Sequence, residues 1–309
     1  MMGIVTQVNA NMRARFVTLA TAVLAVASVL TTGRLLAASP LEVQVLQTSE
    51  HSLYTNITLV KGEHRAVLID TPFTRADAYR VLADVLESGK ILDTIFITHD
   101  HPDHFFSLEV LADAFPEARV IAAPAVVDDI WKSIPLKVKR WGPMLGRNGP
   151  RHPTAPTALT ENFFELEGHR FEVIGPMQGD HVHSTAVWIP GIKTLVAGDL
   201  LFNEMHLWFG EVQKPGRLAW AQSVEKLAAL GATRVVAGHK KPGLPDDASA
   251  IAYTQRYLQV FEQAVSTSKT SAELRAKVLA AFPNTIDWMD FLLSNSSKVA
   301  MGESPPWQE

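Results

Sequence analysis

The sequence predicts an α+β fold, and three observations lead to that prediction. Short apolar runs of strand length recur along the chain, stretches with a helical apolar face separate several of them, and histidines and aspartates follow four of the runs. Strands that alternate with helices pair in parallel and carry their sites at the carboxyl ends of the strands. The polar residues are therefore expected to converge on one edge of the folded domain.

The first strands are expected to form an antiparallel sheet. Leu41–Gln47, Asn56–Val60 and His64–Asp70 alternate or run apolar, as strands do. A helix is expected next, because Thr74 can cap its first turn and Asp77 stands three residues further on.

Alternating strands and helices should follow this opening sheet. The sequence predicts strands at Ile91–Ile97 and Arg119–Ala123 and helices at Ser107–Phe115 and near Ala125–Lys132. Closely spaced glycines and prolines from Gly142 to Thr160 then predict a long loop, of the kind that forms lids or mobile segments.

The second half of the chain repeats the strand-first order. A hairpin should join Phe163–Leu166 to Arg170–Ile174, and Leu218–Leu230 has a helical pattern. Further strands are expected at Thr185–Ile189, Lys193–Ala197 and Arg234–Ala237.

Three regions are predicted along the chain. Residues 1–39 combine an arginine-containing start, an uncharged and mostly apolar stretch, and small residues before Pro40, which is typical of a secretory signal. Residues 40–245 form the main domain, and residues 246–309 form a C-terminal extension of two or three helices, one of them capped by Thr270 with Glu273. The protein is therefore expected to be exported to the periplasm, or anchored in the membrane if the first segment is retained.

Composition narrows the class of protein. Hydrophobic residues make up 47% and charged residues 19%, which is ordinary for a globular chain. Removing the three arginines that precede Glu42 from a net charge of −4 leaves −7, which argues against a nucleic-acid partner. The chain has no cysteine, so nitrogen and oxygen atoms must hold any metal. The expected partner is a small-molecule substrate, with membrane contact only through an uncleaved N-terminal segment and with the C-terminal helices available for a homodimer contact.

The segment after the Ile91–Ile97 strand predicts a metal site. It contains His99, His101, Asp103 and His104. Such a density of imidazoles and carboxylates at the end of a buried strand is costly unless a cation satisfies it, and this mixture suits zinc or another borderline divalent metal. His99 and His101 should project to one side of an extended segment, whereas Asp103 and His104 open the next helix and can turn toward a second ion.

Residues of the same chemical types follow later strands. His181 and His183 precede one strand, Asp199 follows another, and His239 follows a third. Gly198 permits close approach of the backbone before Asp199, so the Asp199 carboxylate could bridge two ions.

Taken in order, these motifs resemble those of the metallo-β-lactamase superfamily. The resemblance runs from residue 41 to residue 245 and includes Leu68–Thr71, His-x-His-x-Asp-His at 99–104, a histidine near 181, Ala-Gly-Asp at 197–199 and Gly-His at 238–239. It implies a four-layer αββα sandwich with a two-metal site at one edge. By this resemblance His99, His101 and the histidine near 181 hold one ion, Asp103, His104 and His239 hold the other, Asp199 bridges them, and Asp70 has a supporting role.

The third motif departs from the family pattern. The family usually has Gly-His-Thr-x-Gly-Ser, whereas this chain has Gly-Asp-His-Val-His-Ser-Thr at 179–185, and counting back from Pro190 places the usual histidine at Asp180. His181 is the preferred ligand, because imidazole suits zinc and a one-residue change in a loop is easy. His183 and Asp180 are the alternatives, and Asp180 would shift the metal preference toward manganese or iron.

A hydrolase is the expected activity. Two divalent ions, zinc or alternatively manganese or iron, would share a water, lower its pKa toward ~7 and polarise the substrate, while Asp103 orients that water or moves its proton. The bridging Asp199 resembles the lactonase, thioesterase and phosphodiesterase branches of the family, and apolar residues after it favour a small ester or lactone. His206 and Trp208 are the candidate pocket residues. The alternatives are a β-lactamase-type hydrolase, an iron-dependent oxidoreductase on the same fold, and a binding protein without turnover.

Overall fold

The computed structural model describes residues 39–308 of the chain. The predicted N-terminal signal, residues 1–39, therefore lies outside the described residues except at its last position. Within residues 39–308, no helix is both long enough and apolar enough to cross a membrane. Ala38–Glu309 form one compact unit, so the expected helical extension belongs to the same unit as the main domain.

The first sheet contains the strands predicted in the first half of the chain. Its strands are β1 (Glu42–Gln47), β2 (Asn56–Lys61), β3 (Arg65–Ile69), β4 (Ile91–Ile97), β5 (Arg119–Ala122) and β6 (Thr157–Ala158), in that spatial order. β1, β2 and β3 pair antiparallel, and the pairs from β3 to β6 are parallel. The antiparallel opening and the parallel continuation both follow the sequence prediction.

The second sheet is formed by the second half of the chain. Its strands, in spatial order, are β12 (Arg234–Val236), β10 (Thr194–Val196), β9 (Ser184–Ile189), β8 (His169–Met177) and β7 (Phe163–Leu166). All neighbours pair antiparallel except β10 and β12, which are parallel. Two short strands, β11 (Phe202–Asn203) and β13 (His239–Lys240), pair in parallel beside this sheet.

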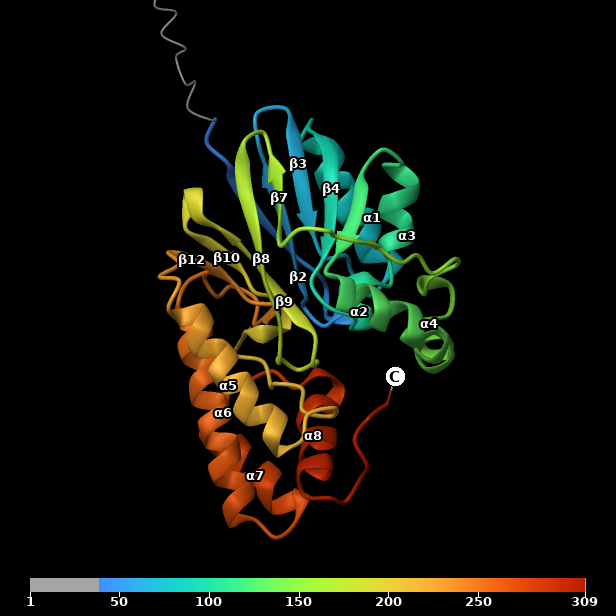
Figure 1. Ribbon diagram of the computed structural model, residues 1–309. Helices are drawn as coiled ribbons and strands as arrows, with labels where there is room; N and C mark the ends of the chain where they lie inside the picture. Colours follow the sequence, from blue (N-terminus) through green and yellow to red (C-terminus); the bar gives the residue numbers. More distant parts are fainter. Residues whose placement is uncertain (1–38, 309) are drawn as a thin grey trace, which may run out of the picture. The chain divides into compact units, whose positions relative to one another are not determined.

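Helices cover the outer faces of both sheets. They are α1 (Arg75–Glu87), α2 (Pro102–Phe105), α3 (Leu108–Ala114), α4 (Pro124–Leu145), α5 (Lys214–Ala228), α6 (Ser249–Thr267), α7 (Ser271–Ala281) and α8 (Leu292–Ala300). Short 3-10 turns occur at Glu50–Ser52, Gly146–Asn148, Pro190–Ile192, Gly198–Leu200 and Trp288–Asp290. In Figure 1, α5 to α8 gather below the two sheets, and α1 and α3 lie beside the first sheet.

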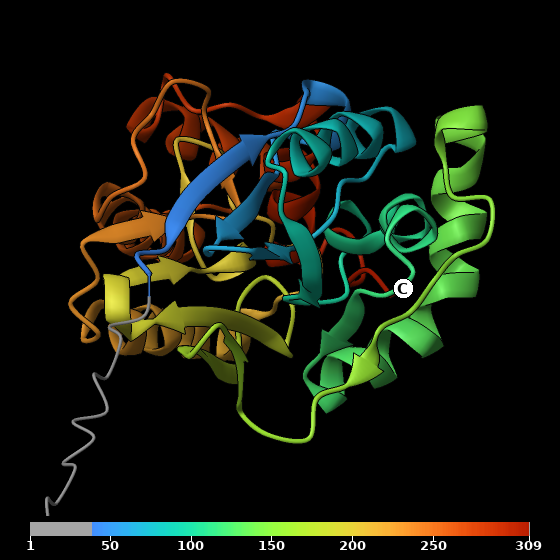
Figure 2. The same ribbon diagram turned by 90° about the horizontal axis from the view of Figure 1, so that it is seen from above.

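Three apolar layers hold these elements together. Val67 of the first sheet packs with Phe171 of the second sheet in the layer between them, where the blue-to-teal and yellow strands face each other in Figure 2. Ile95 belongs to the layer between the first sheet and α1, α3 and α4, and Leu195 to the layer between the second sheet and α5 and α6. Each fully buried side chain of this kind contributes about 1.5–3 kcal/mol. The result is the αββα sandwich that the motifs implied.

Both predicted helix caps are present. The Thr74 hydroxyl accepts a hydrogen bond from the backbone N–H of Asp77 at the start of α1. The Thr270 hydroxyl accepts one from the backbone N–H of Glu273 at the start of α7. Each cap satisfies an N–H that the first helical turn leaves without a partner.

The predicted loop at Gly142–Thr160 is shorter than expected. The helix expected near Ala125–Lys132 continues as α4 to Leu145, through Pro135 and Pro143, and β6 forms within the remainder of the loop. Tertiary contacts stabilise the extra turns. Lys137 is buried with its Nζ 2.9 Å from the Asp100 Oδ2, and Trp141 packs edge-on against Phe73. These contacts outweigh the tendency of Pro135 and Pro143 to break a helix. A prediction from local sequence takes only that tendency into account.

Candidate metal centre

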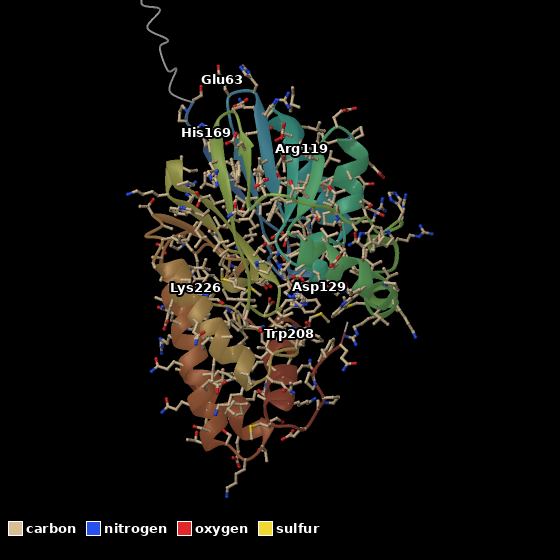
Figure 3. The ribbon with its side chains drawn as sticks, in the orientation of Figure 1. Glu63, Arg119, Asp129, His169, Trp208 and Lys226 are labelled. Atoms are coloured by element: carbon tan, nitrogen blue, oxygen red, sulfur yellow. The ribbon has the colours of Figure 1, made fainter. Side chains whose placement is uncertain are left out.

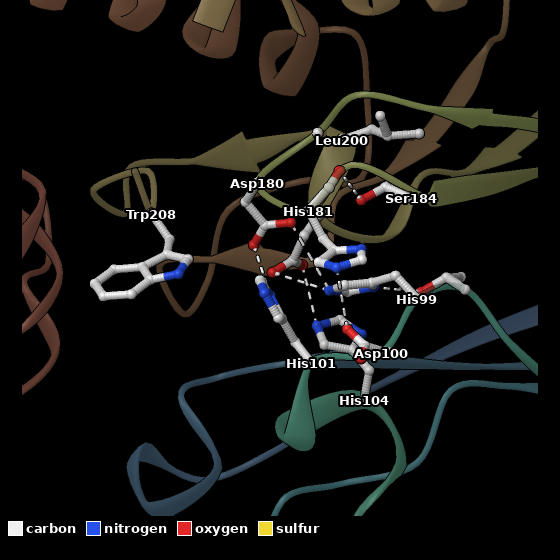
Figure 4. Close-up of polar contacts among 12 residues, drawn as sticks. His99, Asp100, His101, His104, Asp180, His181, Ser184, Leu200 and Trp208 are labelled. Carbon is white, nitrogen blue, oxygen red and sulfur yellow. Dashed lines mark hydrogen bonds and ion pairs between the residues drawn. The ribbon is translucent and has the colours of Figure 1, made fainter. Parts of the chain in front are cut away.

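The carboxyl ends of the central strands bring seven buried side chains to one edge of the sandwich. His99 and His101 follow β4, and Asp103 and His104 lie in α2, the short helix that comes next. Asp180 comes from the connection between β8 and β9, Asp199 from the 3-10 turn after β10, and His239 from the start of β13. Figure 4 shows His99, His101 and His104 facing Asp180 across a small space.

These side chains form two groups whose ligand-type atoms lie within 4.8 Å of one another. One group is His99, His101, Asp180 and Asp199, and the other is Asp103, His104 and His239. Asp199 belongs to the first group and also contacts the second. Its Oδ1 lies 3.0 Å from the His104 Nε2, and its Oδ2 lies 3.2 Å from the His239 Nε2.

The two groups fit divalent metal ions. The His101 Nδ1 lies 3.0 Å from the Asp180 Oδ2, and the His239 Nε2 lies 3.1 Å from the Asp103 Oδ2 and 3.4 Å from the His104 Nε2. Ligand atoms about 2.1 Å from a tetrahedral ion are separated by about 3.4 Å, close to these spacings. The His99 Nε2, both Asp180 carboxylate oxygens and the Asp199 Oδ1 are buried without a hydrogen bond of good geometry. Cations would satisfy these atoms.

Each of the four histidines is oriented through its other ring nitrogen. The His104 Nδ1 lies 2.8 Å from the Asp70 Oδ2, and the His239 Nδ1 lies 2.8 Å from the Leu53 carbonyl oxygen. The remaining two contacts are the His99 Nδ1 with the Thr98 Oγ1 at 3.0 Å, and the His101 Nε2 with the Glu211 Oε1 at 3.1 Å. Such contacts fix the tautomer and direct the free nitrogen of the ring toward a metal.

Asp70 supports two of these histidines. Besides its contact with His104, it accepts hydrogen bonds from the Thr98 backbone N–H and the Thr98 hydroxyl, each at 2.8 Å. Because the Thr98 hydroxyl donates to Asp70, its oxygen is left to accept from His99. Asp70 thus occupies the supporting position that the motif pattern implied.

Two glycines allow the strand-end loops to approach this closely. A Cβ at Gly238 would lie 1.9 Å from the Asp199 Oδ1, so any side chain there would displace that carboxylate. Gly198 has a φ of +50°, and a Cβ there would lie 2.7 Å from the Thr98 Oγ1. The close approach expected before Asp199 therefore depends on glycine at both positions.

Burial disfavours the charged form of every group in the cluster, and the neighbouring charges determine whether each pKa is raised or lowered. Burial and the nearby His104 hold the pKa of His99 well below its usual value. Burial also disfavours protonated His239, but Asp199 outweighs it and raises the pKa of His239 to about 10. Burial disfavours ionised Asp199, but His239 and His104 hold the pKa of Asp199 well below its usual range. Protons and metal ions therefore compete for the same atoms.

A family comparison agrees with this arrangement. The model of the metallo-β-lactamase superfamily matches residues 52–239, which is more than half of the chain. The chain belongs to the metallo-β-lactamase superfamily. Its relatives include a hydroxyacylglutathione hydrolase of Aliivibrio salmonicida, 28% identical over 73% of this chain and 75% of the relative. A probable metallo-hydrolase of Streptococcus pyogenes is 26% identical over 52% of this chain and 68% of that protein.

Solved structures of the superfamily share the fold. The DIM-1 metallo-β-lactamase superimposes with a TM-score of 0.52 at 20% identity, over 72% of this chain and 96% of that one. At that identity the likeness concerns the fold alone. Together with the sequence relatives and the cluster of potential ligands, it makes this protein a metallohydrolase of the metallo-β-lactamase fold.

In this superfamily member, Asp180 occupies the position for which the sequence analysis preferred His181. The preference for His181 was wrong about placement, because the connection from β8 to β9 is a tight turn closed by the Gly179 N–H and the His181 carbonyl oxygen, 2.9 Å apart. Thr185 is fixed to the Thr98 carbonyl oxygen by its N–H at 3.0 Å. With the turn held in this way, Asp180 and not His181 lies with His99, His101 and Asp199, in agreement with the count back from Pro190.

His181 and His183 lie outside both groups of potential ligands. The His181 Nε2 faces the Asp100 Oδ1 at 3.5 Å, and its Nδ1 accepts a hydrogen bond from the His183 backbone N–H. The His183 ring turns outward, with its Nδ1 2.6 Å from the Asp129 Oδ2 on α4. Figure 4 shows His181 beside Asp100, adjacent to the cluster.

A pocket with aromatic walls opens onto the cluster. Its floor is formed by His101, Asp103, Asp180, Asp199 and His239, with Glu211 at the side. Its walls are Leu53, Phe73, Pro102, Trp141, Phe202, Trp208, Trp288, Phe291, Leu292 and Trp307. None of these lining residues is a lysine or an arginine. The walls are therefore apolar, and the charged residues of this lining belong to the floor or are Glu211.

The two candidate pocket residues have different places. Trp208 lines the pocket and lies between the sheets and the lower helices in Figure 3. His206 is fully buried away from the pocket, with its Nδ1 2.7 Å from the Tyr257 hydroxyl, so its selection as a pocket residue was wrong. Sequence reasoning did not find Trp288, Phe291 and Trp307. They lie far along the chain from every motif, and no local pattern distinguishes them from core residues.

Proposed function

We propose that this protein is a dinuclear metallohydrolase that cleaves a small, apolar ester or lactone. One observation carries the proposal: the Asp199 carboxylate lies 3.8 Å from the His99 Nε2 of the first ligand group and 3.0 Å and 3.2 Å from the His104 and His239 Nε2 atoms of the second. It does so at the floor of an aromatic pocket that has no cationic side chain in its lining. The shared carboxylate supports two ions held close together, and the lining supports an uncharged substrate.

The residues of the floor have distinct roles in this reaction. Divalent ions bound there supply a water of lowered pKa and an electrophilic centre for the substrate carbonyl. His104 and His239 are held by Asp70 and by the Leu53 carbonyl, so their Nε2 atoms stay aimed at the site. Asp103 faces the pocket, and its Oδ2, which accepts a hydrogen bond from the Thr55 hydroxyl at 3.3 Å, is placed to orient the attacking water and hold its proton.

The pocket walls support an apolar substrate. Trp208 stacks on Phe291 with ring centroids 5.2 Å apart, and Trp307 meets Trp208 edge-on at 5.2 Å. Such surfaces bind acyl chains or rings by burial of apolar area. A glutathione conjugate, the substrate named for the Aliivibrio relative, carries carboxylates at neutral pH, for which the lining has no lysine or arginine.

Asp180 bears on the identity of the metals. With Asp180 the first group has two imidazoles and two carboxylates, whereas the second group has two imidazoles, Asp103 and a share of Asp199. Oxygen ligands broaden the preference of the first group toward manganese and iron, and we propose zinc for the second.

A second candidate function follows from the same residue. His99, His101 and Asp180 are two histidines and one carboxylate, the ligand set of many non-haem iron oxygenases. An iron-dependent oxidoreductase is therefore the alternative that this structure supports.

Elemental analysis and a substrate panel test these proposals together. We expect about two divalent ions per chain and turnover of apolar nitrophenyl esters or lactones ahead of carboxylate-bearing esters. Two irons in a coloured protein that consumes dioxygen would select the oxidoreductase. Preferential cleavage of β-lactams would replace ester or lactone hydrolysis by a β-lactamase activity.

We also propose that residues 1–39 direct export to the periplasm. The positive start, the apolar stretch and the small residues before Pro40 support this. Cell fractionation with N-terminal sequencing tests it, and a cytoplasmic protein that retains these residues would contradict it.

A further inference from the structure

We propose that Glu211 is a positioning residue that orients His101 toward the metal centre and links it to the aromatic wall of the pocket. The inference rests on the proposed metal centre but not on the identity of the substrate. Glu211 lies in the connection between β11 and α5, and its side chain is 17% exposed at the side of the pocket.

One oxygen of Glu211 makes both contacts. The Glu211 Oε1 lies 3.1 Å from the His101 Nε2 and accepts a hydrogen bond from the Trp208 Nε1 at 3.3 Å. An ionised carboxylate only accepts hydrogen bonds, so the contact requires a proton on the His101 Nε2. The His101 Nδ1, 3.0 Å from the Asp180 Oδ2, is then the nitrogen available to a metal. Glu211 thereby selects the tautomer that can bind.

The other histidines of the centre provide an internal comparison. His99, His104 and His239 are held by Thr98, Asp70 and the Leu53 carbonyl, all of which precede the first metal motif or adjoin it. The acceptor for His101 instead comes from a segment more than a hundred residues later, which also forms part of the pocket wall. Of the four contacts, this is the one made by a side-chain carboxylate that also accepts a hydrogen bond from a pocket-wall indole, that of Trp208.

Trp208 extends the coupling into the pocket. It donates to Glu211 and stacks on Phe291. A substrate that packs against Trp208 therefore contacts a ring whose N–H is bonded to the same Glu211 oxygen that contacts His101. Removing the indole N–H by Trp208→Phe should alter substrate binding but leave the His101 contact, and hence metal affinity, in place.

Metal affinity of three variants tests the proposal. Chelator competition with zinc alone should give Glu211→Ala an affinity about 10–100-fold below wild type for one of the two ions, as expected for loss of a residue that orients a ligand. Glu211→Gln keeps an acceptor oxygen for the His101 Nε2 and should recover most of that loss. Glu225→Ala removes an exposed glutamate on α5 and should match wild type.

Two further readouts distinguish positioning from a general structural role. The metal-free variants should unfold at the same temperature as metal-free wild type, and the cobalt-substituted spectrum should change in Glu211→Ala and return toward wild type in Glu211→Gln. Unchanged zinc affinity in Glu211→Ala would overturn the proposal, as would an equal loss in Glu211→Gln and Glu211→Ala. Failure of wild type to bind zinc, manganese or iron would instead overturn the proposed function.

Discussion

The floor and the walls of the pocket are built in different ways. The floor consists of buried histidines and aspartates carried by short connections at the ends of β4, β8, β10 and β12. The walls are aromatic side chains from α4, from the connection before α5, from the 3-10 turn at Trp288–Asp290, and from the segment after α8. Side chains on rigid strand ends are held to the precision that metal ligands require, whereas apolar walls can vary with substrate. The floor should therefore determine whether the protein binds metal and reacts, and the walls what it accepts.

The largest effect should come from the residue shared by the two ligand groups. Asp199→Ala removes a carboxylate that contacts both His104 and His239, and with it the ligand that the two groups share. We expect loss of bound metal together with a fall in activity larger than the 10–100-fold that is typical of a supporting residue. Elemental analysis and ester hydrolysis measure both. Asp128→Ala on the exposed side of α4 is the control, and an Asp199→Ala variant that keeps metal and activity would refute the role of the floor.

The second effect concerns the choice of metal. Asp180→His restores the histidine that the family usually has at this position and should shift the preference from manganese or iron toward zinc, on the order of tenfold. His181→Ala should leave the metal content unchanged, because the His181 ring faces Asp100. Competition between zinc and manganese, followed by elemental analysis, checks both. Metal loss in His181→Ala with none in Asp180→Ala would reverse the assignment.

Residues of the floor that follow a recognisable strand can be predicted from the sequence, whereas a residue placed by contacts between distant segments cannot. His99, Asp199 and His239 follow strands with recognisable apolar patterns, so their convergence was predictable. Asp180 was at the position that counting indicated, but chemical preference for imidazole favoured His181. The turn that fixes Asp180 depends on contacts between Thr185 and Thr98, which are distant in sequence.

The residues of the pocket walls could not be predicted from local sequence patterns, because contacts between distant segments place them. The sequence predicts a helix only near Ala125–Lys132 and a loop from Gly142, whereas packing of Trp141 and the Lys137 contact with Asp100 continue α4 to Leu145. Trp307 lies in a segment without regular structure. Its backbone N–H donates a hydrogen bond to the Gly210 carbonyl oxygen at 2.8 Å, which holds the segment against the pocket. No periodicity marks such a residue.

A wall substitution should affect binding more than reaction. Trp307→Ala removes a ring that packs against Trp208 and Phe291 at centroid distances of 5.2 Å and 5.1 Å. Loss of about 1.5–3 kcal/mol of apolar contact would raise KM for an apolar ester roughly 10–100-fold with little change in kcat. Trp131→Ala is the matched control, because Trp131 is 63% exposed. A fall in kcat alone would contradict the separation of walls from floor.

The smallest effect concerns the segment where floor and wall meet. Leu53 lines the pocket and holds His239 through its carbonyl oxygen, and Asp77 ties this segment to α1 through the Ser49 hydroxyl at 2.7 Å. Burial opposes ionisation of Asp77, but hydrogen bonds from Ser49, Ser52 and Arg80 outweigh it and lower the pKa of Asp77.

A lowered pKa gives this contact a definite pH dependence. The stabilisation by Asp77 is present above the unfolded pKa of about 3.9 and is lost as the pH falls through the lower folded value. Asp77→Asn should therefore cost about 1–2 kcal/mol of unfolding free energy at pH 7, and this difference should shrink below about pH 4. Urea unfolding of both proteins at pH 7 and pH 3 measures it, and a constant difference would show that the charge of Asp77 does not hold the segment. Metal affinity should change less than in Glu211→Ala, because the Leu53 carbonyl that meets His239 is itself retained.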